Sequence, residues 1–335
     1  MTAFAIDTPR AEPPVRRYGT ALFAAAAAVA FALAMIAPLL VTVVGLALFG
    51  LPHTALETRY VVGRFAPRFG PRALAWWLAP ITIVVIARLV RFGPAKQVEI
   101  GVAVAVAIAA WIWATRGSPW LMVSGAVVLA VLGFASLAAI AWFVVLVAFL
   151  HNLTPVPFLW EWSPPRRVGF RLVHLIWAVA VPALILSGAC DGLLSHAAGW
   201  AVSGAGTTTD VAALYTPPPL LSGPWPLRFL ATFAFLQTMH YVVWCAFVPA
   251  ATAEESQAAA RVGPLAPLWR RPPFLVVVAV AAAVATTLFV LDYTTARWMY
   301  GAIASYHAYV EFPVLAVLAA TALGAGPAIR RRQET

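Results

Sequence analysis

Long apolar runs separated by short polar stretches dominate this chain. A helix needs roughly 20 apolar residues to cross a bilayer, and several runs reach or approach that length. The pattern predicts an all-α, polytopic membrane helix bundle in which residues 1–335 form a single integral membrane domain. The predicted helices lie at 20–37, 38–54, 73–91, 98–115, 119–133, 134–153, 171–190, 228–249, 273–292 and 296–323.

Two stretches, 20–54 and 119–153, are too long for one crossing. Each would form a single helix of roughly 52 Å, whereas the hydrocarbon core of a bilayer is about 30 Å thick. We place breaks at Pro38 and Gly133, because proline and glycine end helices more readily than other residues. The pattern is compatible with eight to ten transmembrane helices, and we choose ten.

The composition agrees with a membrane protein: 63% of the 335 residues are hydrophobic, against about 45–50% in soluble domains. The net charge is +10, with nearly all of the positive charge carried by arginine. These arginines lie between the apolar runs, as expected for loops held at the cytoplasmic face. We therefore interpret the positive charge as a determinant of how the helices are oriented in the membrane. The predicted partners are membrane lipids, and no nucleic acid is expected.

The charge pattern places both termini in the cytoplasm, in a bacterial-type inner (plasma) membrane. Groups of arginines mark the predicted inside segments at 10–17, 59–72, 166–171, 261–271 and 330–332. The stretch 191–227 contains no Lys or Arg and is predicted to be a long external loop. One loop disagrees with the rule, because Arg88, Arg91 and Lys96 would lie outside.

Two segments combine a histidine with a carboxylate four residues later, His53 with Glu57 and His307 with Glu311. On a helix, residues four apart lie on the same face. Ionisable groups inside a membrane are costly to bury and mark functional sites. Glu57 closes the second apolar run and Glu311 lies deep in the last one, with His307 as its nearest local partner.

Two further histidines, His151 and His240, lie in similar apolar surroundings. With the predicted topology, all four histidines meet in the cytoplasmic half of the bilayer. Neutral imidazole is the commonest metal ligand, and three or four histidines with a nearby carboxylate suit Fe or Zn. We therefore predict a metal site with the ligands His53, His151, His240 and His307.

Glu57 and Glu311 are predicted to orient the ligands or to complete the metal shell. Tyr306, next to His307, is a third catalytic candidate, because it can line an aromatic cavity for an apolar substrate. For His174 we expect one interhelical hydrogen bond, and for His196 a solvated position in the external loop. No phosphate loop, nucleophile elbow, zincin motif or haem-attachment motif is present.

The segment Phe49-Gly-Leu-Pro-His53-Thr-Ala-Leu-Glu57 resembles the Gly-x-Pro-His-Gly-Ala-Leu-Asp segment of the Brp/Blh family of membrane β-carotene dioxygenases. Met239-His240-Tyr241 and the segment from Tyr306 to Glu311 look like later elements of that family. Trp244 stands where the family has a further histidine. The resemblance implies a non-haem iron site that uses His53 and His240, and carotenoid cleavage as the reaction.

The leading hypothesis is a membrane-embedded non-haem Fe(II) oxygenase that uses O₂ on a lipid-soluble, carotenoid-like substrate. A haem-binding electron-transfer protein is the first alternative, because two histidines on facing helices can hold a haem b. A transporter or assembly factor with a buried His/Glu path is the second. Zn is the alternative bare metal ion, and the sequence does not give the oligomeric state.

Overall fold

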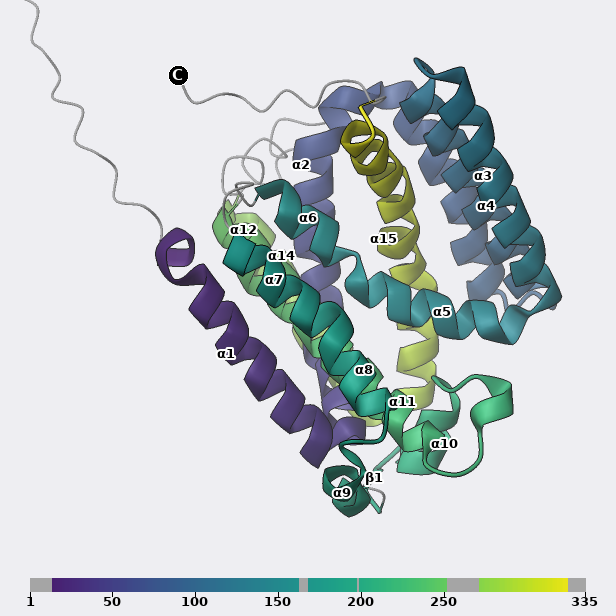
Figure 1. The fold of residues 1–335 in the computed structure, drawn as a ribbon. Coiled ribbons are helices and arrows are strands. Elements are labelled where there is room, and N and C mark those ends of the chain that lie inside the picture. The colour runs from purple at the N-terminus through teal and green to yellow at the C-terminus, as the bar shows by residue number, and fades with distance from the viewer. Residues whose placement is uncertain (1–13, 163–167, 198, 252–270, 325–335) are drawn as a thin grey trace, which may run out of the picture.

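In the computed structural model, helices dominate the described part of the chain, which comprises residues 14–162, 168–197, 199–251 and 271–324 (Figure 1). Nine helical segments among these residues are long and apolar enough to cross a membrane. The predicted all-α polytopic bundle is therefore confirmed. The two chain ends and the predicted inside loops around 166 and 261–270 lie outside the described residues.

The bundle is built from helices that follow the apolar runs. In chain order they are α1 (Pro14–Ile36), α2 (Pro38–Leu89), α3 (Ala95–Thr115), α4 (Pro119–Ala138), α5 (Ile140–Leu153), α6 (Pro155–Trp162), α7 (Val168–Leu175), the π-helix η1 (Ile176–Ala180), α8 (Val181–Leu186), α11 (Trp225–Val242), the π-helix η4 (Val243–Phe247), α12 (Val248–Ala251), α14 (Arg271–Leu291) and α15 (Tyr293–Ala322).

The break predicted at Pro38 is confirmed, since α1 ends at Ile36 and Pro38 is the first residue of α2. The break predicted at Gly133 is wrong, because α4 continues to Ala138 and the helix is interrupted at Ala139 instead. Gly133 has a different role: a Cβ there would lie 2.8 Å from Cγ1 of Val104 on α3. The glycine thus allows α3 and α4 to pack closely, as small residues do between membrane helices.

The helix α2 spans 52 residues and changes direction along its length. In its first limb, the hydroxyl of Tyr300 on α15 donates to the Gly50 carbonyl, and His53 lies against His307. Residue numbers rise together in these pairs, so the first limb runs in the same direction as α15.

In the second limb of α2 the order is reversed. Thr82 contacts Tyr306, whereas the later residue Arg88 contacts the earlier residue Gly301. The second limb therefore runs antiparallel to α15, and α2 bends over between the limbs (Figure 1). The intervening sequence contains Gly70-Pro71, and proline is the usual cause of a sharp bend in a helix.

The bend affects the number of crossings. The first limb contains the candidate span Pro38–Phe65, and the second limb contains the shorter apolar helix Trp76–Leu89. The observed number of long spans lies within the predicted eight to ten. Our choice of ten counts Trp76–Leu89 as a crossing, although this segment falls below the length that a full crossing needs.

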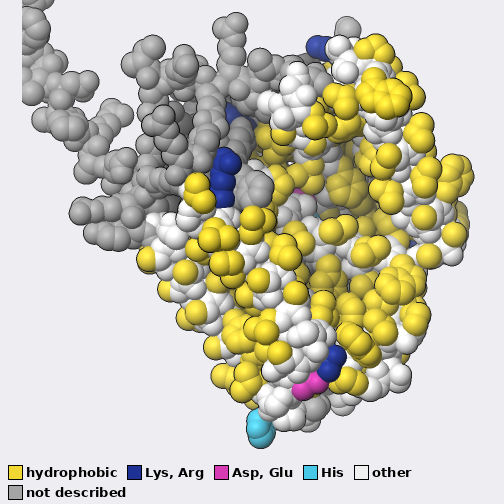
Figure 2. All heavy atoms as spheres, in the orientation of Figure 1, with side chains coloured by type: hydrophobic (Ala, Val, Ile, Leu, Met, Phe, Trp, Pro, Cys, Tyr) yellow, Lys and Arg dark blue, Asp and Glu magenta, His cyan; other side chains and the backbone are white. Residues whose placement is uncertain are grey.

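The helices α2, α11 and α15 form the inside of the bundle. Among the candidate spans, α11 with η4 has the largest buried share, whereas few residues of α4 and α14 are fully buried. Figure 2 shows a surface covered mainly by hydrophobic side chains, with very few charges along the helices. Such a surface is typical of contact with lipid rather than with water.

The predicted external loop folds into short elements at one end of the bundle (Figure 1). They are α9 (Asp191–Leu194), the 3₁₀-helices η2 (Ser195–Ala197) and η3 (Pro218–Leu220), the hairpin strands β1 (Ala201–Val202) and β2 (Gly206–Thr207), and α10 (Thr208–Ala213). Arg228 on α11 donates to both carboxylate oxygens of Asp191, at 2.8 and 2.5 Å. These hydrogen bonds hold the pKa of Asp191 below its usual range and tie the loop to the bundle.

The substitution Gly125→Ala tests the packing of α3 against α4. A Cβ at Gly125 would lie 2.0 Å from Nε1 of Trp111, and this indole N–H donates to the Leu121 carbonyl at 2.7 Å. We expect the variant to lose about 1–3 kcal/mol of stability through overpacking, measured as a lower melting temperature in detergent. The matched control is Gly101→Ala on α3, which has open space around it and should melt no lower than the wild type. Equal melting of both variants would contradict this packing.

Candidate metal centre

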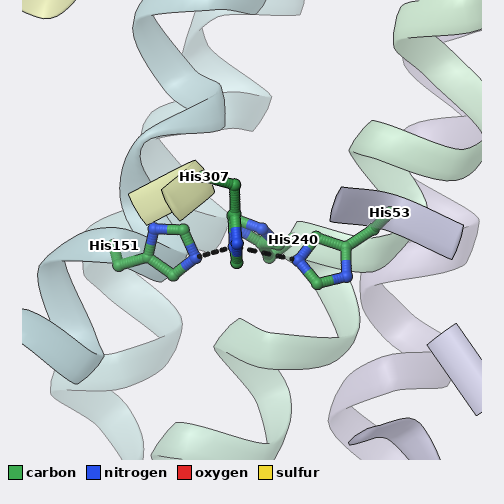
Figure 3. Close-up of side chains that lie close together, drawn as sticks. All are labelled: His53, His151, His240 and His307. Carbon is green, nitrogen blue, oxygen red and sulfur yellow. Dashed lines mark hydrogen bonds between the residues drawn. The ribbon is translucent and has the colours of Figure 1, made fainter. Parts of the chain in front are cut away.

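Four histidines from four different helices converge inside the bundle (Figure 3). Each offers one ring nitrogen, and the four nitrogens all lie within 4.8 Å of one another. The residues are His53 on α2, His151 on α5, His240 on α11 and His307 on α15. The structure thus brings together the whole set of histidines that the sequence predicts as metal ligands.

The site lies deeper than the sequence analysis expected. His53 is near the middle of the span Pro38–Phe65, because α2 continues past Glu57 instead of ending there. His307 is near the middle of α15, and His151 sits where α5 meets α6, inside the span Ile140–Leu159. The expectation that His53 and His151 lie at helix ends is therefore wrong, whereas the mid-helix position expected for His307 is observed.

Three of the histidines point the same nitrogen, Nε2, at a shared centre. Nε2 of His307 lies 3.0 Å from Nε2 of His151 and 3.3 Å from Nε2 of His53. Two nitrogens bound to one metal ion at about 2.0–2.1 Å lie roughly 2.9–3.4 Å apart in adjacent positions of a tetrahedron or octahedron. The observed separations therefore fit ligands of one ion.

The other nitrogen of each of these rings, Nδ1, faces a hydrogen-bond acceptor. Nδ1 of His53 lies 2.7 Å from the Phe49 carbonyl, and Nδ1 of His151 lies 2.9 Å from Oε2 of Glu311. Nδ1 of His307 lies 3.3 Å from the hydroxyl of Thr54. This hydroxyl already donates to the Gly50 carbonyl at 2.9 Å, so it accepts from His307.

These partners fix the tautomers, because a neutral imidazole carries one N–H. With all three Nδ1–H groups donating outward, the three Nε2 atoms carry lone pairs that face one another. Lone pairs at these distances repel unless a cation or a proton lies between them. Outward hydrogen bonds of this kind orient metal-ligating histidines in proteins, and the arrangement therefore fits a bound metal ion.

His240 completes the cluster, and it differs from the other three histidines in its hydrogen bonding. Both of its ring nitrogens are buried without a partner among the described residues, although its ring centroid lies only 4.7 Å from that of His151 and 5.0 Å from that of His53. Leaving a buried polar group without a partner costs about 1–3 kcal/mol. A metal ion at the shared centre would satisfy one of these nitrogens directly.

The carboxyl groups lie behind the histidines, but they do not pair as expected. Glu311 is fully buried and accepts from His151 at 2.9 Å and from the Thr154 hydroxyl at 2.6 Å. Glu57, also buried, shares a hydrogen bond with Glu311. The predicted pairing of Glu311 with His307 on its own helix is therefore wrong, since Glu311 orients a histidine of another helix.

Helix geometry explains this outcome. Side chains on a helix lean toward its N-terminus, so Nδ1 of His53 reaches back to the carbonyl of residue 49, four residues earlier. A carboxylate four residues later lies on the opposite side of the ring. The His-x-x-x-Glu spacing correctly brings both residue types to one region, but it does not determine which residues pair.

The histidines form one wall of a cavity of about 350 Å³. Apolar residues of α5, including Phe143, Val144 and Val147, form another wall. All four histidines line the cavity, whereas neither Glu57 nor Glu311 is among its described lining residues. One side of the histidine cluster therefore faces open space, and the other faces buried carboxyl groups.

Tyr306, the third predicted catalytic residue, points away from this cavity. Its hydroxyl contacts Thr82 on the second limb of α2, and it is not among the cavity-lining residues. Four other tyrosines of the described chain line the cavity instead, among them Tyr241 and Tyr300 beside the histidines. The ring of Tyr241 packs 4.6 Å from that of His53, and the sequence signal for Tyr300 is its spacing of seven residues before His307, which places both on one helix face.

The two remaining histidines lie outside the cluster. His196 is exposed in η2, as expected for the external loop. His174 on α7 is buried between Phe23 and Phe170, with ring centroids 4.5 and 4.1 Å away. Neither of its nitrogens has a hydrogen-bond partner among the described residues, so the expected interhelical hydrogen bond is absent there.

Comparison of the chain with models of protein families, with curated proteins and with solved structures found no match.

Removal of one central histidine should abolish metal retention. His307→Ala removes the nitrogen that contacts both other Nε2 atoms, so we expect purified protein to lose its stoichiometric metal. The matched control is His196→Ala, which changes the same residue type in the exposed loop and should keep the metal. Elemental analysis of both variants measures the outcome, and equal metal content would refute the assignment of this centre.

The hydrogen bond from Thr154 to Glu311 offers a finer test. Thr154→Val removes the donor that holds the carboxylate which orients His151, and loss of such supporting partners typically weakens metal binding about 10–100-fold. Thr154→Ser keeps the hydroxyl and should bind metal like the wild type. Competition against a chelator gives the two affinities, and identical values for the valine and serine variants would show that this support is unimportant.

Proposed function

We propose that this protein is a membrane-embedded, metal-dependent oxygenase with non-haem Fe(II) at the histidine cluster. The observation that carries the proposal is the convergence of three Nε2 lone pairs whose Nδ1–H groups are all held by outward acceptors. His53, His151, His240 and His307 would hold the ion. Bound there, iron would supply the binding and activation of O₂, a chemistry known for iron sites of nitrogen and oxygen ligands with open positions.

The asymmetry of the site supports an open position on the cavity side. Protein groups fill the space behind the ligands, where Glu57 and Glu311 lie, whereas the opposite side borders the cavity. Apolar side chains of α5 in the cavity suit a lipid-soluble substrate and exclude water from the reacting atoms. A carotenoid-like substrate is our proposal from the resemblance of the His53 segment to the Brp/Blh family.

The pair of carboxyl groups has a separate role. Two buried carboxyl groups in contact share a proton, because two like charges at that distance cannot both persist in a low-dielectric interior. With a divalent cation bound nearby, Glu57 and Glu311 would therefore hold one proton and one negative charge next to His151. The negative charge offsets part of the charge of a bound divalent cation, and the shared proton remains available near the site.

The spacing of the rings argues against haem b. A haem places two axial histidines on opposite faces of a wide planar macrocycle. Here three imidazoles meet with nitrogens 3.0 and 3.3 Å apart, which leaves no gap for a macrocycle between them. A single bare ion suits this geometry better. Zn shares the same ligand types, so the metal must be identified by measurement.

Elemental analysis and an absorption spectrum of the detergent-purified protein test the metal. We expect one Fe per chain and no Soret band. Stoichiometric Zn would remove the oxygenase proposal while leaving the metal centre intact. A Soret band would instead favour the haem alternative and overturn the proposed geometry of the centre.

Coexpression with a β-carotene pathway tests the substrate. Cells with the wild-type protein should lose orange colour, whereas cells with the His307→Ala variant should stay orange. The His196→Ala variant should behave like the wild type. Persistent colour with metal-loaded wild-type protein would exclude β-carotene as the substrate without affecting the metal assignment.

A further inference from the structure

One face of α15 forms a continuous wall of the cavity from a cation to the metal centre. The lining residues on this face are Arg297, Tyr300, Gly301, Ala304, His307 and Ala308. Their spacing of three or four residues places them in one stripe along the helix. Because Gly301, Ala304 and Ala308 are small, they leave room for a ligand chain beside the helix.

The length of this wall indicates how long a ligand must be to reach from Arg297 to His307. Ten residues separate Arg297 from His307, which corresponds to about 15 Å along a helix. An extended chain covers roughly 3.5 Å for every three bonds, so about a dozen bonds would span the distance. A ligand held at Arg297 by one end would therefore place atoms about a dozen bonds away at the histidines.

The cavity carries an excess of positive charge. Its described lining contains three cations, Arg88, Lys96 and Arg297, but one carboxylate, Glu99. Glu99 is already occupied: Arg88 donates to both of its oxygens at 2.9 Å, Lys96 donates at 2.9 Å, and the Tyr309 hydroxyl also donates. No carboxylate in the lining is left for Arg297.

Arg297 has one polar partner in the cavity wall, the hydroxyl of Tyr215. Among the described residues it forms no ion pair with a carboxylate, unlike Arg88 and Arg228. An arginine stays charged at any physiological pH and presents a planar fork that matches a carboxylate. Its exposure to the cavity therefore favours a ligand that brings the counter-charge.

Arg88, Lys96 and Glu99 form an ionic cluster. This cluster also explains why one loop departs from the rule that positive charge lies on the cytoplasmic side. Arg88 and Lys96 come from the loop region that the charge pattern would place outside. In the structure, the Arg88 side chain turns into the bundle, where it also donates to Ser305 on α15 at 2.9 Å. These cations thus belong to the cavity wall instead of marking a cytoplasmic loop. Charges retained inside a membrane protein generally mark a ligand pathway.

We propose that the cavity binds an amphiphilic acid, namely an apolar chain with a terminal carboxylate. Arg297, with Tyr215 beside it, holds the carboxylate, and the chain lies along Gly301 and Ala304 toward the histidine cluster. This proposal rests on the proposed function for the role of the histidines, and it narrows the substrate class. A purely hydrocarbon carotenoid would enter the same cavity but bind less tightly than the acid, because it leaves Arg297 without a counter-charge.

Binding of the conjugated polyene parinaric acid and of its methyl ester to the detergent-purified, metal-loaded protein tests this proposal by fluorescence. The two probes have the same chain, but the ester lacks the negative charge. We expect the acid to bind at least about tenfold more tightly than the ester, as a charge-assisted hydrogen bond allows. Equal affinities would overturn the proposal.

Variants of Arg297 locate the binding site. Arg297→Gln should bind the acid and its methyl ester with nearly equal affinity, whereas Arg297→Lys should retain part of the preference for the acid. The matched control is Arg91→Gln, because Arg91 stacks on Trp298 nearby, 4.4 Å from the ring centroid, without lining the cavity. An unchanged acid preference in Arg297→Gln would overturn the assignment.

Further measurements distinguish a failure of this binding proposal from a failure of the proposed function. The metal content of Arg297→Gln should equal that of the wild type, because residue 297 is about 15 Å from residue 307 along α15. A protein without bound iron that still prefers the acid would overturn the proposed function alone.

Lysophosphatidic acid serves as a probe that carries a phosphate group instead of a carboxylate. If this lipid binds more tightly than the carboxylate, and if Arg297→Gln abolishes that tighter binding, the choice of a carboxylate would be overturned.

Discussion

The candidate metal centre depends on one electrostatic constraint, the convergence of several unshared lone pairs at a single point inside the helix bundle. Three imidazoles direct Nε2 inward while their Nδ1–H groups are held by Phe49, Thr54 and Glu311. None of these rings can turn to relieve the repulsion without losing its outward hydrogen bond. A positive charge at the centre would relieve this repulsion, and binding of a metal ion there would then be coupled to folding.

Two irregular features of the helices, the α5–α6 junction and the bend in α2, help to bring the histidines together. The α5–α6 junction at Thr154 places His151 at mid-bundle, and the hydroxyl of Thr154 then holds Glu311. The bend in α2 brings its two limbs against α15 in opposite directions, so one limb supplies His53 and the other supplies Arg88. One helix thus contributes to both the metal centre and the ionic cluster of the cavity.

The sequence predicts the helices and the histidines because both signals are local. Hydropathy gives the spans, and the cost of burying ionisable groups in a membrane marks His53, His151, His240 and His307. It does not predict which groups pair, since hydrogen bonds to a backbone carbonyl or a residue of another helix have no sequence pattern. Gly133 illustrates the same limit, because a glycine that permits close packing looks like a glycine that ends a helix.

The separation of polar groups around the histidines has a chemical consequence. The carboxyl groups of Glu57 and Glu311 lie on the protein side, where Glu311 orients His151, and the cavity side presents imidazole and apolar surface. A substrate in the cavity would therefore meet the histidines, and an ion held by them, without meeting a carboxylate there. Because Arg88 and Lys96 both pair with Glu99, Arg297 is the cation of the described lining that is left for a ligand. A chain whose negative end is held at Arg297, as proposed, would reach the histidines with its apolar part, and the distance between the two ends would fix the atom that lies at the centre.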